Sequence, residues 1–225
     1  MAPGFHDIYA LRARALRCLG EFKEALSDHS VVISQKPRSA VAFEERGGTY
    51  YAAGQFSSSV ADYGFASDIS PKLDDPLINR GRAYEAMQDL ELARKDYEDV
   101  LKRNPASSEA ALRLYIVRAS SDEAAAAKEL AEFAERHKQD DGFYPIIEVI
   151  LGRQSEAPVL AAHGSKLCET EIFLAKFYRL RSQPEKADQM LRDASTHCAK
   201  SEVSYFEARF MLASMAGHSD SGKPQ

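Results

Sequence analysis

Few residues of this 225-residue chain are spaced for catalysis or metal binding. None of the histidines forms the i, i+4 helical pair with an interposed glutamate that zinc peptidases use. The six are dispersed: His6, His29, His137, His163, His197 and His218. The run Arg46-Gly47-Gly48-Thr49 lacks the lysine of a phosphate loop, and no serine stands in a nucleophile elbow. The sequence therefore predicts no catalytic residue, no metal site and no cofactor; a helical enzyme would need a clustered acid–base or metal site.

Two kinds of charged residue, in contrast, recur at a fixed interval of 34 residues. They are Arg12, Arg46 and Arg80, and Asp28, Asp62 and Asp96. Each aspartate follows its arginine by 16 residues, an offset at which a helical hairpin brings two side chains together. Because guanidinium binds carboxylate bidentately, we favour three Arg–Asp pairs that join helix to helix. The alternative is three arginines that line a ligand groove.

The elements that would position these pairs repeat with the same period. Prolines mark it at Pro37, Pro71 and Pro105, and small residues recur at Ala13, Gly47 and Gly81. Small residues let two antiparallel helices approach closely, while larger side chains in phase with them fill the groove between the helices. Gly20 and Gly54 stand where the first helix of a unit would end in a left-handed residue. Each unit is therefore predicted to be a helical hairpin.

This 34-residue pattern resembles the tetratricopeptide repeat family, with three good copies at residues 6–39, 40–73 and 74–107. The resemblance implies an all-α fold: a right-handed superhelix, or α-α solenoid, of about five helical hairpins plus a C-terminal capping helix. We expect a single solenoid over residues 1–216. It would continue through degenerate hairpins at 108–162, a good repeat at 168–201 and a capping helix at 202–216. Residues 217–225 are predicted to be a disordered tail.

Two of the three cysteines occupy matching ends of the last good repeat. Cys168 and Cys198 stand at its first and thirty-first positions, which an antiparallel hairpin brings close together. A disulfide is one interpretation, and two small buried thiols are the other. Cys18, just before Gly20, is expected to be free.

A surface for partners is implied by the family resemblance. In tetratricopeptide proteins the second, fifth, ninth and twelfth positions of the first helices line the concave face. The groove residues predicted on this basis are Arg14, Arg17, Glu44, Tyr51, Ile78, Arg82 and Glu85. Family members that bind chaperone tails use a different set, and here those positions hold Ala10, Arg14, Glu45, Asp75 and Asn79. Glu45 and Asp75 would repel a terminal carboxylate, so a chaperone-tail adaptor is disfavoured.

Composition and charge restrict the class of partner. Lys and Arg total 29 against 34 Asp and Glu, a net charge of −5, so neither nucleic acid nor an anionic membrane is a favoured partner. The longest apolar stretches fall far short of the roughly 20 residues that span a bilayer, and we expect no integral membrane segment. The N-terminus shows neither the basic start nor the apolar core of a signal peptide.

The order of the units is similar to that of bacterial NlpI-type outer-membrane lipoproteins. Three contiguous repeats are followed by a degenerate stretch with a short helix at 143–152, and then by an isolated repeat that includes residues 171–178. That resemblance implies a non-enzymatic, often dimeric periplasmic scaffold. The location would be the periplasm if an upstream signal had been removed, and the cytoplasm otherwise.

We therefore predict a non-enzymatic scaffold or adaptor that binds protein or peptide partners in its groove. The alternative is a structural subunit that self-assembles, as a homodimer, through the C-terminal helix and its residues Phe206, Phe210 and Met211. Light scattering would separate the two hypotheses.

Overall fold

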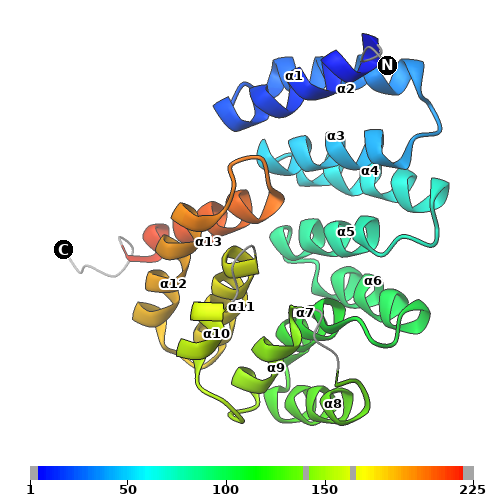
Figure 1. The fold of residues 1–225 in the computed structure, drawn as a ribbon. Coiled ribbons are helices and arrows are strands. Elements are labelled where there is room, and N and C mark those ends of the chain that lie inside the picture. Colours follow the sequence, from blue (N-terminus) through cyan, green and yellow to red (C-terminus); the bar gives the residue numbers. More distant parts are fainter. Residues whose placement is uncertain (1–4, 139–141, 163–165, 220–225) are drawn as a thin grey trace. The chain divides into compact units, whose positions relative to one another are not determined.

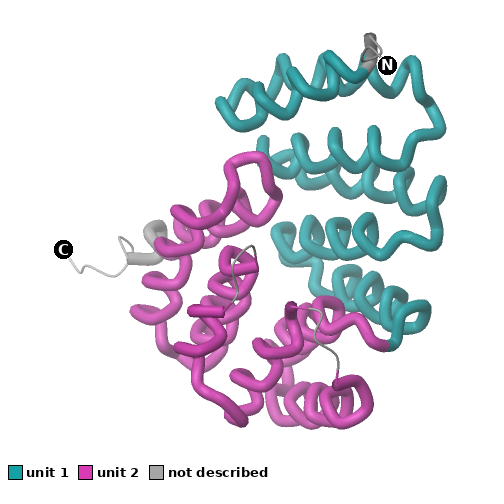
Figure 2. The backbone as a smooth tube through the Cα atoms, viewed as in Figure 1, with its two compact units in different colours: residues 1–105 teal, residues 106–225 magenta. Residues whose placement is uncertain are grey.

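The described residues of the chain are helical and contain no strand. The structure is a computed structural model that describes residues 5–138, 142–162 and 166–219. Over these residues it has helices α1 to α13 (Figure 1). The all-α solenoid that the sequence predicts is thus confirmed. The chain divides into two compact units, unit 1 at residues 1–105 and unit 2 at residues 106–225 (Figure 2), and the single solenoid over residues 1–216 stays a prediction.

Unit 1 is a run of three antiparallel helix pairs. They are α1 (Phe5–Leu19) with α2 (Phe22–Gln35), α3 (Ala40–Ala52) with α4 (Phe56–Ile69), and α5 (Asp75–Ala86) with α6 (Leu90–Arg103). Between pairs, α2 packs against α3 and α4 packs against α5. The first helix of each pair therefore lies between its own second helix and, in α3 and α5, the second helix of the preceding pair.

Unit 2 is less regular. It contains α7 (Ser108–Ala119) with α8 (Glu123–Arg136), the short helices α9 (Tyr144–Ile150) and α10 (Glu156–Ala162), and α11 (Leu167–Leu180) with α12 (Pro184–His197). The last helix, α13 (Val203–Ser219), packs against α12 and α11. Counting α9 with α10, the described residues hold six helix pairs where about five were expected, because seven residues suffice for each helix of the short pair.

The turns inside the hairpins share one backbone conformation. Gly20 and Gly54 have φ of +81° and +72°, as predicted for the left-handed residue that ends a first helix. Gln88 and Ser182 occupy the same place in their hairpins with φ of +62° and +56°. A side chain in this region costs roughly 1 kcal/mol relative to glycine, so the surrounding hairpin must impose the turn at these two positions.

Close packing inside each pair explains the small residues of the repeat. A Cβ atom built on Gly47 would lie 3.0 Å from two ring carbons of Tyr63, and one on Gly81 would lie 2.5 Å from Cε1 of Tyr97. Both tyrosines are fully buried. The second helix thus presses an aromatic ring onto the backbone of the first, which only glycine permits without a shift of the ring.

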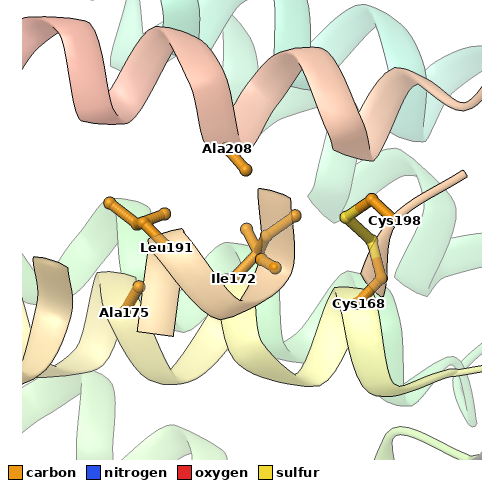
Figure 3. Close-up of a cluster of buried hydrophobic side chains, with 7 residues drawn as sticks. Cys168, Ile172, Ala175, Leu191, Cys198 and Ala208 are labelled. Carbon is orange, nitrogen blue, oxygen red and sulfur yellow. A yellow bond between two sulfur atoms is a disulfide. The ribbon is translucent and has the colours of Figure 1, made fainter. Parts of the chain in front are cut away.

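The core at the end of unit 2 contains a disulfide. Cys168 at the start of α11 is bonded to Cys198 just after α12, with their Cα atoms 4.9 Å apart (Figure 3). The pair belongs to a buried cluster with Ile172, Leu191 and, from α13, Ala208. Of the two interpretations of these cysteines, the structure supports the disulfide, and Cys18 is free as expected.

The C-terminal helix α13 extends to Ser219, and the disordered tail expected over residues 217–225 stays a prediction. The rest of the predicted tail, residues 220–225, lies outside the described residues. Within the described part of the chain, no helix is both long enough and apolar enough to span a membrane.

Candidate protein-binding surface

The first helices of unit 1 carry all seven residues that the sequence assigns to partner binding. We call the side chains at the second, fifth, sixth, ninth and twelfth positions of the first three repeats, which lie on α1, α3 and α5, the first-helix face. Ser39 begins α3 by accepting a hydrogen bond from the backbone N–H of Ala42, and Pro76 stands in the first turn of α5. These helix starts fix which side chains reach the face.

Glu45 joins the first two repeats at this face. Its Oε2 lies 3.3 Å from Nη2 of Arg17, whose Nη1 also donates to the Glu45 carbonyl at 3.2 Å. Nε of Arg14 lies 4.0 Å from the other carboxylate oxygen. The Arg17 side chain is 7% exposed and that of Arg14 is 50% exposed. One arginine is therefore part of the packing between repeats, while the other remains accessible to a partner.

Glu44 and Asn79 make the corresponding connection between the second and third repeats. Nδ2 of Asn79 donates to Oε1 of Glu44 at 3.2 Å, and Nη1 of Arg82 donates to Oδ1 of Asn79 at 3.4 Å. Burial raises the pKa of Glu44 to about 6, and the neighbouring charge of Asp75 adds to the shift. A partly buried carboxylate thus titrates close to neutral pH on this face.

The seven predicted groove residues differ widely in exposure. Four are buried, contrary to the expectation of an open wall, with 2 to 7% of their surface exposed: Tyr51, Ile78, Arg17 and Arg82. The ring of Tyr51 packs edge-on against Phe56, 5.2 Å between centroids. Glu44 and Glu85 are half-buried, and Glu85 accepts a hydrogen bond from the Tyr97 hydroxyl at 2.5 Å. A partner would therefore meet Arg14, Glu44 and Glu85 first.

Sequence reasoning missed the role of two residues. Glu45 and Asn79, both at the sixth position of their repeats, connect the predicted residues to one another. The signal was their alignment, because polar side chains at one position of consecutive first helices lie at the same level of neighbouring helices. Through them the structure brings Arg14 close to Arg17, and Glu44 close to Arg82.

Comparison with known proteins agrees with this architecture. The tetratricopeptide repeat family matches residues 75–107, the span of the third predicted repeat. The chain is similar to mouse RNA polymerase II-associated protein 3, with 32% identity over 91 residues, which are 40% of this chain and 14% of that protein. The match thus spans only a small part of that relative's length.

Two solved structures are similar to the chain, and the first of them shows the same fold. A tetratricopeptide repeat protein from Parabacteroides merdae has a TM-score of 0.54 and 17% identity, over 94% of this chain and 86% of that one. The first tetratricopeptide domain of Spaghetti (RPAP3), solved with an HSP90 peptide, has a TM-score of 0.47 and 24% identity, over 51% of this chain and 91% of that one.

Residues 75–107 of the chain thus match the tetratricopeptide repeat family, and the chain has the fold of a tetratricopeptide repeat protein.

Beyond the repeat pattern, unit 1 contains the three predicted Arg–Asp pairs. All are bidentate, with N···O distances of 2.6 to 2.8 Å: Arg12–Asp28, Arg46–Asp62 and Arg80–Asp96. Burial raises the pKa of Asp96, although its hydrogen bonds with Arg80 act in the opposite direction. In turn, the hydrogen bond to Asp96 raises the pKa of Arg80.

The helices of unit 2 are joined by other interactions. Glu207 of α13 lies 2.6 Å from Nζ of Lys176 on α11 and 3.8 Å from Nη1 of Arg113 on α7, and the exposure of all three side chains is 10% or less. The Arg113 guanidinium also lies over the ring of Phe173, 5.1 Å from its centroid. The capping helix is thus held to two first helices by a buried group of charges.

One group of possible metal ligands exists among the described residues. Ligand atoms of Cys168, Glu169 and Glu202 lie within 4.8 Å of one another. The sulfur of Cys168 is bonded to Cys198, however, so it cannot act as the thiolate that a metal requires. Two carboxylates remain, fewer than the three or four protein ligands of a zinc site.

Proposed function

We propose that this chain is a non-enzymatic adaptor that binds a segment of a partner protein across the first-helix face of unit 1. The observation that carries the proposal is the pair of polar connections, Arg14 and Arg17 with Glu45, and Glu44 with Asn79 and Arg82. Each connection links consecutive first helices, so the charges of three helices are held at fixed positions on one surface. Fixed charges of this kind select a partner and set its register.

The distribution of charge indicates the kind of segment that fits. The accessible charged groups are one cation, Arg14 on α1, and carboxylates on all three helices: Asp7, Glu44, Asp75 and Glu85. A segment with both acidic and basic side chains would pair with them, whereas one of a single sign would meet repulsion on at least one helix. We therefore propose a partner segment of mixed charge.

A chaperone tail is not the proposed ligand. The similar RPAP3 domain was solved with an HSP90 peptide, but the positions used for such tails hold Glu45 and Asp75 here. Both carboxylates would oppose the terminal carboxylate of a peptide. In addition, the Glu45 carboxylate already lies beside Arg17, the nearest buried cation.

Photocrosslinking from the first-helix face tests the proposal. A photoreactive residue at position 14 of the full chain should capture a partner in host extract, and the same residue at position 38 should not. Arg38 is exposed in the turn between α2 and α3 and is not one of the residues of the first-helix face. The captured partner is then purified and its affinity for defined variants is measured.

Two matched charge-reversal variants test whether the captured partner binds at the first-helix face. Arg14→Glu should lower affinity about tenfold or more, because it reverses the accessible cation of the face, while Arg38→Glu should change affinity less than about twofold. Equal affinity of the Arg14→Glu variant and the unmodified chain would refute the proposed surface.

An adaptor of this kind acts by mass action, since holding two partners together raises their effective concentration.

An oxidising compartment is the location that the structure favours, and it fits a role in the cell envelope. The Cys168–Cys198 disulfide is the specific observation, because such bonds persist in secreted and periplasmic proteins and are rare in the cytosol. Acid quenching of host cells, followed by alkylation with a mass tag, measures its state. Two tagged cysteines at positions 168 and 198 in the native host would contradict an oxidising location.

Self-assembly through the C-terminal helix would need residues other than those first proposed. Phe206 is 5% exposed, and its ring packs edge-on against Tyr205, 5.2 Å between centroids. It therefore belongs to the interior of unit 2. A homodimer through α13 would have to use Phe210 and Met211, which are half-buried.

A further inference from the structure

Two glutamates lie beside the disulfide at the end of the α11–α12 hairpin. Sγ of Cys168 and one carboxylate oxygen from each of Glu169 and Glu202 lie within 4.8 Å of one another. Cys198 is bonded to the same sulfur. Glu169 follows Cys168 on α11, while Glu202 stands in the turn just before α13. Two sulfurs and two carboxylates from three parts of unit 2 therefore meet at one point.

One oxygen of the Glu169 carboxylate lacks a partner in the disulfide-bonded chain. Its Oε2 atom is buried and has no hydrogen-bond partner within the described part of the chain. A buried carboxylate oxygen without a hydrogen bond is destabilising, and such atoms are uncommon in folded proteins. A cation held between the sulfurs and the carboxylates would compensate this oxygen.

Reduction of the disulfide would supply the remaining ligands. A dithiol breaks the S–S bond by exchange and is itself oxidised to a disulfide, which leaves thiols at Cys168 and Cys198. The Cα atoms of the two cysteines are 4.9 Å apart in the oxidised chain. Zinc–thiolate bonds of about 2.3 Å in a tetrahedral site place two sulfurs about 3.7 Å apart. Rotation about each Cα–Cβ bond can provide that separation without movement of the helices.

The packing around the cysteines would keep them adjacent after reduction. Both belong to a buried cluster with Ile172 of α11, Leu191 of α12 and Ala208 of α13 (Figure 3). Cys168 and Cys198 themselves are 4% and 6% exposed. Burial of these apolar side chains favours the closed hairpin whether or not the sulfurs are bonded. The reduced chain therefore presents two neighbouring thiols with two carboxylates beside them.

This set of ligands favours zinc over the other common metal ions. Mg²⁺ and Ca²⁺ bind through oxygen, whereas Cu(I) prefers sulfur to carboxylate oxygen. Zn²⁺ accepts both cysteine sulfur and carboxylate oxygen, and it takes four ligands in structural sites. The two thiols would release their protons to water as the ion binds, because the thiolate is the form that binds the metal.

We propose that the reduced chain binds one Zn²⁺ ion through Cys168, Cys198, Glu169 and Glu202. Zinc and the disulfide are then alternative ways of closing the same hairpin, one in the reduced chain and the other in the oxidised chain. The inference does not depend on the partner surface of unit 1. In an oxidising location, the zinc form belongs to the chain before the disulfide forms or after it is reduced.

Metal titration of the full chain in both redox states tests the inference. The chain is reduced with excess dithiothreitol, which is then removed without oxygen, and Zn²⁺ is titrated in competition with a chromophoric chelator. The reduced chain should bind one Zn²⁺ per molecule, and the oxidised chain should bind none at this site. Co²⁺ in place of Zn²⁺ should give the charge-transfer absorption of cobalt–thiolate bonds, which reports directly on the sulfurs.

Thermal unfolding gives a second readout. Zn²⁺ should raise the thermal midpoint of the reduced chain, because the ion binds the folded hairpin, and should leave the midpoint of the oxidised chain unchanged. Circular dichroism follows this unfolding, and it also shows whether each variant is folded.

Variants of the carboxylates separate the proposed site from a simple dithiol. Glu169→Gln and Glu202→Gln should each weaken Zn²⁺ binding at least about tenfold, because an amide is a poorer zinc ligand than a carboxylate. The matched control is Glu185→Gln, at an exposed position at the start of α12, which should change the affinity less than about twofold. Cys18→Ser should likewise keep the binding, since Cys18 is not part of the site.

The inference would be overturned by a reduced chain that binds no Zn²⁺, or whose thermal midpoint Zn²⁺ does not raise. An oxidised chain that binds Zn²⁺ as tightly as the reduced chain would contradict the role of the sulfurs. Binding that either Glu169→Gln or Glu202→Gln leaves unchanged would refute the proposed set of four ligands.

Discussion

Units 1 and 2 build the same helical hairpin with different ties between its helices. In unit 1 each hairpin is joined by a bidentate Arg–Asp pair. In unit 2 the last hairpin is closed by the Cys168–Cys198 disulfide, and the positions equivalent to Arg80 and Asp96 hold Leu174 and Met190. The hairpin is defined by two features: small residues that pack against large side chains, and a left-handed turn. The interaction that joins its two helices can be ionic, apolar or covalent.

The largest expected change in stability comes from removing the disulfide, which only unit 2 contains. Replacing both Cys168 and Cys198 by serine should lower the free energy of unfolding of unit 2 by about 3 to 4 kcal/mol, the cost expected for opening a loop of this length. The sequence separation is 30 residues. Hydrogen exchange read separately for each unit should show faster exchange in α11 to α13 and no change in α1 to α6.

One result would contradict this prediction for the Cys168–Cys198 disulfide. If the serine variant exchanges at unchanged rates in α11 and α12, the disulfide does not stabilise unit 2. Reduction of the unmodified chain, without any substitution, is the control for effects of the serine hydroxyls.

The second effect concerns the ionic tie of unit 1. Asp96→Ala should destabilise the chain by about 2 to 3 kcal/mol, because it leaves Arg80 without its carboxylate in a partly buried site. The double variant Arg80→Leu with Asp96→Leu, which copies the apolar solution of unit 2, should cost less than Asp96→Ala alone. Denaturant unfolding measures both values. A double variant less stable than the single one would show that the ties are not interchangeable.

The third effect tests the interlock of small and large residues. Gly81→Ala should destabilise the chain by about 1 to 2 kcal/mol, since the new methyl group would overlap the fully buried Tyr97 ring. Gly47→Ala meets Tyr63 at 3.0 Å and should be close to neutral, because the gain in helix propensity offsets a small shift of the ring. Thermal unfolding of both variants gives the comparison, and equal destabilisation would contradict the contact distances.

The smallest effect is the pH dependence contributed by Glu44. Its pKa is about 6 in the folded chain and 4.5 in the unfolded reference, so the unfolded state ionises first as the pH rises. Stability should therefore fall between pH 4.5 and 6, by about 1 kcal/mol once solvent screening is allowed for.

Glu44→Gln should remove this decline, and Glu24→Gln, at an exposed site on α2, should keep it. Denaturant unfolding at several pH values between 4 and 8 provides the measurement. A decline of the same size in the Glu44→Gln variant would assign it to other groups.

Most of the fold could be predicted from the sequence because the repeat is chemically marked. Glycines at two of its three turns and the proline after each second helix marked the boundaries of unit 1, and the recurring arginine and aspartate indicated the pairing of its helices. Two turns carried no such mark. Gln88 and Ser182 have positive φ without a glycine, because the rest of the hairpin imposes the turn.

The candidate surface was less predictable. Helical periodicity assigns Tyr51, Ile78 and Arg82 to the proposed face, but it does not tell how closely neighbouring helices approach, and all three side chains are buried. The connecting residues Glu45 and Asn79 depend on that approach as well. Alignment of positions thus gives the direction of a side chain, whereas its exposure requires the packed structure.

The account rests on the first-helix face of unit 1 as the place where a partner binds. Hydrogen exchange of the full chain, alone and saturated with the photocaptured partner, measures this most directly. We predict that binding slows exchange in α1, α3 and α5 and leaves α2, α4 and α6 unchanged. Slower exchange in the second helices or in unit 2 alone, with none in the first helices of unit 1, would contradict the proposed surface.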